Sequence, residues 1–200
     1  MFKYKNNSLK ELGTVINEKF HLSFPFIFKF NNKIYLIPDS SSNKDLRIYV
    51  SDKFPLKWKL HKIILKNVSA TDTMVYKLDK HWQLITNLNP NNTDDLNSEL
   101  FLFNSSDPVN KKWKSFKNNP IIINYSRARN GGIIFQDNKI YRVFQKHNFN
   151  DYGNSIGIEK IFSKKKNSIL KKNSKLKFLR QIQKCHHLNS DGHLSVYDYV

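Results

Sequence analysis

Ionisable side chains stand immediately before four apolar, aromatic-rich runs of this 200-residue chain. Arginine donates two parallel hydrogen bonds to a carboxylate or phosphate, and aspartate accepts hydrogen bonds from hydroxyl groups. Side chains of these types, brought together by the fold, could bind a hydroxylated or anionic ligand. The residues are His21, Asp72, Arg127, Arg129, His186 and His187.

Each of these residues also has a structural explanation. Asp72 could simply form the turn before a strand, and Arg127 and Arg129 could form ion pairs between neighbouring sheets. His186 and His187 are adjacent, and adjacent strand residues point to opposite faces, so the pair does not predict a metal site. We therefore expect no metal and no cofactor.

Catalysis by this chain would need a carboxylate pair. Glycoside hydrolysis uses two carboxyl groups about 5–9 Å apart, and Asp72 and Glu159 are the candidates. The sequence contains no glycine-rich phosphate loop, no nucleophile elbow and no zinc signature. Whether the chain is an enzyme stays open on these grounds.

Three β-hairpins must position these residues. Residues 25–38, 74–85 and 133–144 each contain two β-branched or aromatic arms joined by Asn, Asp or Lys at the bend. A second strand pair follows each hairpin, so the repeating unit is four strands. Units spaced by roughly fifty to sixty residues are typical of propeller blades. Because the first strands of the blades surround one axis, residues far apart in sequence can share one site.

The sequence predicts one all-β domain over residues 1–200, with blades at about 21–65, 70–121 and 126–178 and a partial blade at 182–200. A ring of five such blades needs roughly 250 residues. We therefore expect a five-bladed type of propeller of which three to four blades are present. A helix is expected only near residues 8–19.

Composition limits the functional classes. The net charge of +18 is typical of a protein that binds nucleic acid. However, the lysines are scattered through nearly every segment, which argues against a nucleic-acid partner. The densest patch, Lys164 to Lys177, is read as a solvated face, with an anion-binding edge as the alternative. No signal peptide or transmembrane segment is visible, and Cys185 is the only cysteine, so we expect a cytoplasmic protein.

Several stretches carry a resemblance to a known family. They are residues 21–26, 34–40, 70–73 and 126–132, with Trp82, the Tyr141–Arg142 pair, Gln145, the Tyr152–Gly153 pair and the His186–His187 pair. Over about residues 15–198 the chain resembles the N-terminal five-bladed propeller of plant glucosamine inositolphosphorylceramide transferases. Similar domains occur beside glycosyltransferase or formyltransferase domains. The resemblance adds four expected ligand-binding residues: Ser23, Asn130, Gln145 and Tyr152.

These domains are distantly similar to furanosidase-type glycosidase propellers, whose acids lie at blade entrances. The chain departs from that pattern, because Ser23 stands where a comparable blade offers an acid. It also lacks the separate catalytic domain of the transferases.

The leading hypothesis is a glycan-associated propeller domain of glycoconjugate or surface-polysaccharide biosynthesis. It would bind a sugar or sugar phosphate at the channel mouth. One alternative is a divergent glycoside-processing enzyme that uses paired carboxylates. The other is a basic scaffold that docks a partner glycosyltransferase, a remaining propeller segment or an anionic surface.

Overall fold

The computed structural model describes residues 1–91, 93–148, 151–164, 167–172 and 184–198. For residues 148, 151–153, 163–164 and 167–172 only the backbone is described. Three antiparallel sheets of four or more strands dominate it, as the sequence predicts. Among these residues no helix is long and apolar enough to cross a membrane.

The first sheet contains four strands in chain order. They are β3 (Ser23–Phe30), β4 (Lys33–Asp39), β5 (Asp45–Lys53) and β6 (Lys57–Lys66). A 3₁₀ turn over Ser41–Asn43 joins β4 to β5.

The second sheet repeats this plan and adds a short fifth strand. Its strands are β7 (Ser69–Leu78), β8 (His81–Asn89), β9 (Glu99–Ser105) and β10 (Lys114–Ser115), with β11 (Ile122–Ile123) also paired to β9.

The third sheet contains β12 (Asn130–Gln136), β13 (Lys139–Asn148), β14 (Asp151–Lys164) and β15 (Asn167–Lys172). A two-stranded unit, β16 (Leu188–Ser190) and β17 (Ser195–Tyr197), joins it through a parallel pairing of β16 with β12.

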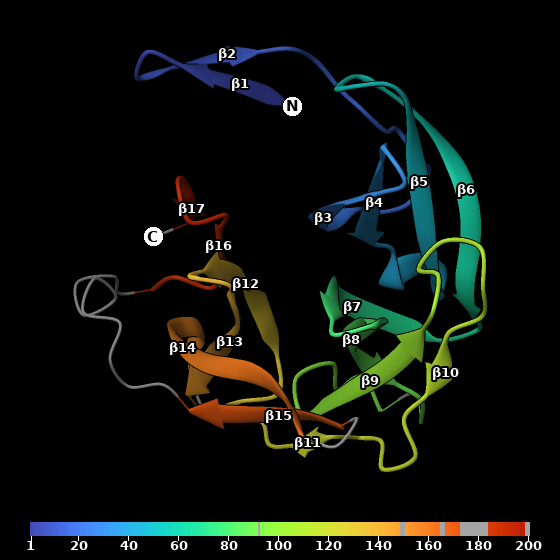
Figure 1. Ribbon diagram of the computed structural model, residues 1–200, viewed down its shortest axis with the longest axis vertical. Coiled ribbons are helices and arrows are strands. Elements are labelled where there is room, and N and C mark those ends of the chain that lie inside the picture. The colour runs from blue at the N-terminus through green and yellow to red at the C-terminus, as the bar shows by residue number, and fades with distance from the viewer. Residues whose placement is uncertain (92, 149–150, 165–166, 173–183, 199–200) are drawn as a thin grey trace.

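The sheets stand around a common centre. Figure 1 shows β3, β7, β12 and β16 on the inside of an arc, with β6, β10 and β15 on its outside. β7 contacts both β3 and β12, so the innermost strands of the three sheets are neighbours. This is the radial arrangement of a propeller, and it confirms the all-β propeller predicted from the repeats.

Asparagine and aspartate form the hairpin bends. Asn31–Asn32 and Asp137–Asn138 all have positive φ, which a two-residue turn between twisted strands requires and which these residue types tolerate. Asp79 has a positive φ in the corresponding turn of the second sheet. The bends therefore arise directly from the residues that the sequence places there.

A β-bulge interrupts each innermost strand at the same place. The pairing register shifts by one residue between Ser23 and Phe26, between Thr71 and Met74, and between Asn130 and Gly132. Within two of these bulges Phe24 and Asp72 have positive φ values of 43° and 49°. A bulge redirects one side chain relative to the rest of its strand.

The hydrophobic core lies between the sheets. The first two sheets contribute most of it, including Ile37, Ile48, Met74 and Ile85, each 0% exposed. Burial of such aliphatic side chains contributes about 1.5–3 kcal/mol each. A smaller cluster joins β16 to the third sheet. The core thus fixes the starts of the innermost strands relative to one another.

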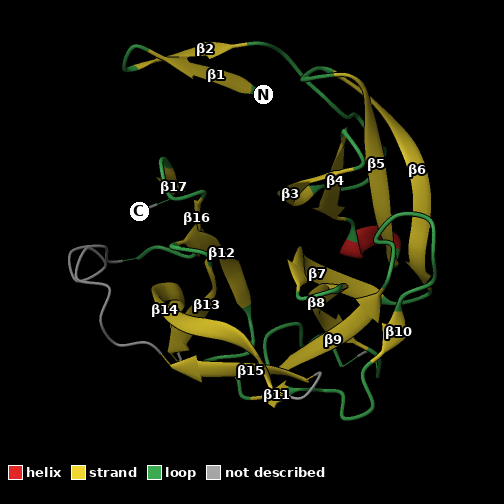
Figure 2. Ribbon diagram, in the orientation of Figure 1, coloured by secondary structure: helices red, strands yellow, loops and turns green. Residues whose placement is uncertain are grey.

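The expectation of a helix near residues 8–19 is wrong. Residues Phe2–Lys5 and Ser8–Glu11 form a hairpin, β1–β2, that lies apart from the sheets in Figure 2. Asn6 and Asn7 have positive φ and form its bend, and this turn chemistry outweighs the weak helical pattern.

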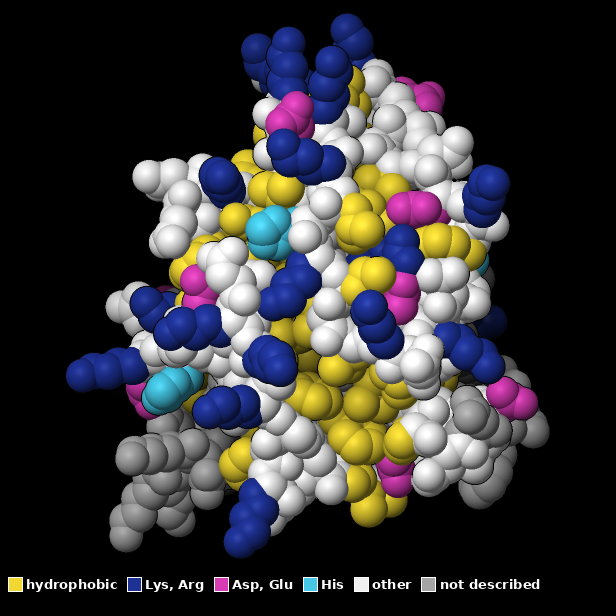
Figure 3. All heavy atoms as spheres, turned by 90° about the vertical axis from the view of Figure 1, so that its right-hand side faces the viewer, with side chains coloured by type: hydrophobic (Ala, Val, Ile, Leu, Met, Phe, Trp, Pro, Cys, Tyr) yellow, Lys and Arg dark blue, Asp and Glu magenta, His cyan; other side chains and the backbone are white. Residues whose placement is uncertain are grey.

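Lysine and arginine side chains are spread over the surface. On the face in Figure 3 they alternate with hydrophobic and neutral side chains from top to bottom. The patch from Lys164 to Lys177 falls on residues whose side chains are outside the described part of the chain.

Candidate functional site

Three sheets contribute to a buried polar cluster where their innermost strands begin. Arg129, just before β12, forms an ion pair with Asp72 at the bulge of β7. Thr71 donates a hydrogen bond to Asp39 at the end of β4, and its hydroxyl lies 3.3 Å from Asp72 Oδ1. Arg129 Nη2 also donates to Thr71 Oγ1 at 3.1 Å. We call Asp39, Thr71, Asp72 and Arg129 the Asp72 cluster.

Burial controls the protonation of Asp72. The side chain is 4% exposed, and its desolvation raises the pKa of the carboxyl above the usual value. The Arg129 guanidinium opposes this shift, whereas the charge of Asp39 adds to it. Buried carboxyls with perturbed pKa values are common at functional sites, although structural ion-pair networks contain them too.

Two amides fix the cluster to the third sheet. Asn130 Nδ2 donates to the Asp72 carbonyl oxygen at 2.8 Å, and its backbone N–H donates to Asn87 Oδ1 at 3.1 Å. Gln145 Nε2 donates to the Asn130 carbonyl at 2.7 Å and to Asp72 Oδ2 at 3.2 Å. Asn130 is 0% exposed, so it holds two blades together rather than facing solvent.

Glu159 belongs to a different ion-pair cluster. It lies directly opposite Arg142 in the β13–β14 pairing, and Arg142 Nη1 donates to Glu159 Oε2 at 3.1 Å. Arg127 binds the other carboxylate oxygen. Arg142 and Glu159 are both 0% exposed, whereas the Arg127 side chain is 40% exposed. We call these three residues the Glu159 cluster.

The burial of Glu159 argues against the prediction that it pairs with Asp72 to hydrolyse a glycoside. Both of its oxygens are held by arginines, and none of its surface is exposed. A substrate cannot touch the carboxyl in this arrangement. The pairing stays a prediction, and this burial counts against it.

The histidine pair connects β16 with the first sheet. The His187 ring stacks on Phe24 with centroids 4.6 Å apart, and burial lowers the pKa of His187. His186 Nδ1 contacts Asp198 Oδ2, and Asp198 Oδ1 accepts the backbone N–H groups of both histidines. The two rings therefore have different neighbours, although both histidines precede β16 and lie outside a strand.

The remaining predicted residues are more peripheral. The His21 side chain is exposed, and its carbonyl oxygen accepts a hydrogen bond from Ser42 at 3.3 Å. Ser23 is half-buried and lies opposite Asp39 in the β3–β4 pairing. Tyr152 lies in β14, but its side chain is outside the described residues.

The structure adds site residues that the sequence did not single out. Asp39, Thr71 and Arg142 form central contacts of the two clusters, and His147 is buried beside them. Desolvation, with the charges of Arg129 and His186, lowers the pKa of His147 to about 4. Asp39, Thr71 and Arg142 lie within the stretches that carry the family resemblance, but their residue types and spacing gave no signal for these contacts.

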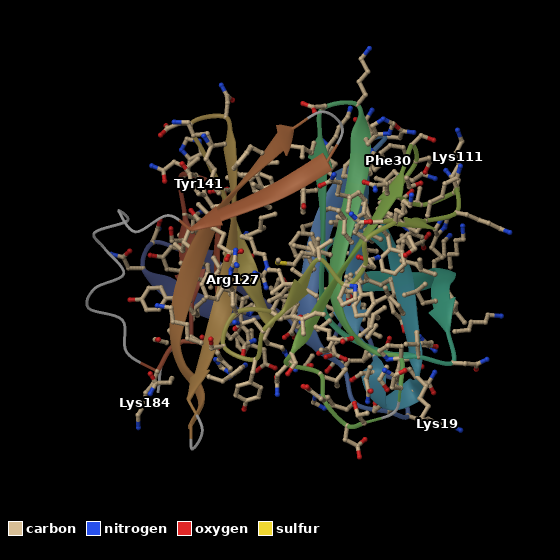
Figure 4. All side chains as sticks on the ribbon, turned by 90° about the horizontal axis from the view of Figure 1, so that it is seen from below. Lys19, Phe30, Lys111, Arg127, Tyr141 and Lys184 are labelled. Carbon is tan, nitrogen blue, oxygen red and sulfur yellow. The ribbon has the colours of Figure 1, made fainter. Side chains whose placement is uncertain are left out.

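Figure 4 shows the two ends of the sheets. Lys19 and Lys184 lie at one end of the sheets, Phe30 and Tyr141 lie at the other, and Arg127 lies between them. The Asp72 cluster belongs to the end where the innermost strands begin. The cavity of about 870 Å³ lies elsewhere, among the hairpin bends, and none of the sequence-predicted site residues line it. In the described residues no three His, Cys, Asp or Glu side chains gather as metal ligands would.

Comparison with known sequences identifies close relatives. Residues 3–194 match the family model described as glucosamine inositolphosphorylceramide transferase 1, N-terminal. The chain is 39% identical over 161 residues to glucosamine inositolphosphorylceramide transferase 1 of Arabidopsis thaliana, and 34% identical over 153 residues to that of Oryza sativa subsp. japonica. These matches cover 78% and 75% of the chain but only 20% of each relative.

Solved structures share the fold at low sequence identity. Inulosucrase from Halalkalicoccus jeotgali bound to kestose gives a TM-score of 0.59 at 9% identity, covering 86% of this chain and 60% of that one. The GH43_1 enzyme from Xanthomonas citri complexed with xylose gives 0.53 at 10% identity, covering 74% and 53%. An exo-beta-1,3-galactanase from Phanerochaete chrysosporium gives 0.58 at 12% identity, covering 89% and 44%. These likenesses confirm the fold.

Proposed function

Because the chain belongs to the family of glucosamine inositolphosphorylceramide transferase N-terminal domains, we propose that it is a glycan-associated propeller domain of glycoconjugate or surface-polysaccharide biosynthesis. The chain spans about a fifth of the length of the curated relatives. Its role would be to bind a sugar or sugar phosphate for a glycosyltransferase partner. We expect the complex to act in the cytoplasm.

The Asp72 cluster is the observation that carries this proposal. Residues of three sheets converge on one carboxyl whose pKa burial raises, at the end of the channel where the innermost strands begin. A buried network of this kind keeps the end of the channel rigid, so that polar groups at its rim can meet sugar hydroxyls and phosphate oxygens in a fixed geometry. Half-exposed Arg127 and His186 would contact the ligand at the rim. Solved proteins of the same fold are described with kestose, xylose and beta-1,3-galactotriose.

A double variant tests the proposal without leaving a charge unpaired. Asp72→Asn with Arg129→Gln removes one acid and one base from the cluster. Asp52→Asn with Lys59→Gln is the matched control, because that ion pair is 60% or more exposed on both sides. Binding is first screened on a glycan array, and dissociation constants are then measured by calorimetry on folded protein.

We expect the cluster variant to lose affinity at least tenfold and the control variant to bind as the wild type does. Arg127→Ala should also weaken binding, because it removes a rim guanidinium. A folded cluster variant with wild-type affinity for the same glycans would refute the proposed site.

The two alternatives make different predictions. A divergent glycosidase would release nitrophenol from a nitrophenyl glycoside and lose that activity in Asp72→Asn. A basic scaffold would bind an anionic surface with strong salt dependence and without regard to sugar.

A further inference from the structure

A cavity of the described structure lies at the opposite end of the channel from the Asp72 cluster. Its volume is about 870 Å³, and it lies between β3, β7 and β12, with the 191–193 turn at its side. Sites for small ligands are typically about 300–1,000 Å³. From Asp72 to Lys77 is five residues of strand, or roughly 16 Å at about 3.3 Å per residue. The cavity and the Asp72 cluster are therefore separate places.

Three lysines line the cavity, one from each of three hairpins. Lys29 belongs to β3, Lys77 to β7, and Lys139 begins β13, and all three side chains are exposed. Among the described residues no carboxylate forms an ion pair with any of them. Three ammonium groups that share a concave surface raise the local affinity for a phosphate or another anion.

The rest of the lining suits a polyol more than a bare anion. Asp137 and Asp191 supply carboxylates, which accept hydrogen bonds from hydroxyl groups. Backbone N–H groups of His193 and Leu194 bind Asp191 Oδ1 and lower the pKa of that carboxyl, so it is ionised at neutral pH.

The apolar part of the lining can cover one face of a sugar ring. Ile27 and Phe135 line the cavity and are 44% and 40% exposed, so part of their apolar surface is accessible to a ligand. Trp82 lies deeper, packed against Phe28 and Phe30 with ring centroids 5.9 and 5.6 Å away. A sugar ring has apolar C–H faces and polar edges, so it matches both kinds of surface.

We propose that this cavity is a second binding site, for a phosphorylated sugar. The lysines would hold the phosphate, the two aspartates would accept the ring hydroxyls, and Ile27 and Phe135 would contact the C–H face. The site does not depend on the Asp72 cluster, because the two share no residue.

Tryptophan fluorescence and calorimetry can test this site on the whole chain. Trp82 lines the cavity, so its emission should change on titration with glucose 1-phosphate, and Trp82→Phe should remove that change. Glucose and inorganic phosphate are the two comparison ligands. We expect glucose 1-phosphate to bind at least tenfold more tightly than either, because each of them lacks one half of the recognised chemistry.

Charge variants distinguish binding in the cavity from a general attraction of the anion to a basic protein. The triple variant Lys29→Gln, Lys77→Gln, Lys139→Gln should weaken glucose 1-phosphate binding at least tenfold. The control Lys53→Gln, Lys57→Gln, Lys117→Gln removes the same charge from exposed positions outside the cavity and should change the affinity less than twofold. Only the Trp82 emission change reports on the cavity alone, because Trp82 lines the cavity and is not part of the Asp72 cluster. The lysine variant should abolish this emission change and the double variant of the Asp72 cluster should keep it, so failure of one site is distinguishable from failure of the other.

Three results would overturn the proposal. The first is equal affinity for glucose 1-phosphate and glucose, and the second is a control variant that weakens binding as much as the cavity variant. The third is preference for an acidic peptide such as polyglutamate over glucose 1-phosphate, which would make the cavity a protein-docking surface.

Discussion

Replacing Glu159 by glutamine should destabilise the protein far more than removing its exposed partner, Arg127. Glu159 and Arg142 are both 0% exposed, so Glu159→Gln leaves the Arg142 guanidinium as a buried charge without a carboxylate. Breaking a buried ion pair from one side costs about 3–5 kcal/mol. A domain of this size has a free energy of unfolding of about 5–15 kcal/mol, so the loss is a large share of it.

Arg127→Ala provides the internal comparison. Its side chain is 40% exposed, and its removal leaves the Arg142–Glu159 pair intact and electrically balanced. Half-exposed ion pairs contribute about 0–1 kcal/mol, so we expect a loss in that range. The difference between the two variants should therefore be about 2–5 kcal/mol.

Replacing both buried partners should recover only part of the stability. Glu159→Gln with Arg142→Met removes both charges, which other buried pairs tolerate. However, Arg142 also donates to the carbonyl oxygens of Arg127 and Ala128 and to Asn130 Oδ1. Those acceptors would lose their donors at a cost of about 1–3 kcal/mol each.

Urea unfolding followed by circular dichroism measures these differences, with the slope on denaturant as a check for two-state behaviour. A loss below about 1 kcal/mol for Glu159→Gln would refute the assignment of a buried counter-ion. An equal loss of unfolding free energy for Arg127→Ala and Glu159→Gln would also refute it. Either result would restore Glu159 as an accessible carboxyl and strengthen the hydrolytic alternative.

Two further predictions concern packing and pH. Gly132→Ala should lower the free energy of unfolding in urea by about 1–3 kcal/mol more than Gly13→Ala does. Both glycines have positive φ, but only at Gly132 would the new Cβ lie 2.0 Å from a backbone atom, the Leu188 carbonyl oxygen. Equal losses for the two variants would contradict the close approach of β16. Burial lowers the pKa of His147 from 6.5 to about 4, so the unfolded chain takes up the proton first, and stability should fall as the pH drops from about 6.5 to 4. His147→Gln should flatten this part of the pH dependence, and an unchanged profile would show that other groups cause it.

The repeat and the turns were readable from the sequence because they depend on local chemistry. Asparagine pairs at the bends and alternating β-branched and aromatic arms predict hairpins, whatever surrounds them. The convergence of Asp72 with Arg129 also followed from the sequence, once the hairpins were placed around one axis. We could predict that Asp72 and Arg129 lie close together because equivalent positions of successive blades meet at the centre of a propeller.

The sequence could not predict the partners of Glu159 and Asp39, and the reason is physical. A strand's pairing register decides which side chain lies opposite which, and a one-residue bulge reverses the faces of the residues beyond it. Arg142 meets Glu159 only because β13 and β14 pair in that register. Asp39 meets Thr71 only because the innermost strands of two sheets are adjacent. Neither condition leaves a signal in a single sequence.

The bulge near the start of each innermost strand gives one end of the channel a repeated backbone feature. Phe24 and Asp72 occupy the same bulge position of the first two sheets, both at positive φ, whereas the bulge of the third sheet contains Gly131 and ends at Gly132, of which only Gly132 has positive φ. One backbone geometry thus presents an aromatic ring in one sheet and a carboxyl in the next. A bulge that accepts both can exchange its side chain without disturbing the strand pairing beyond it.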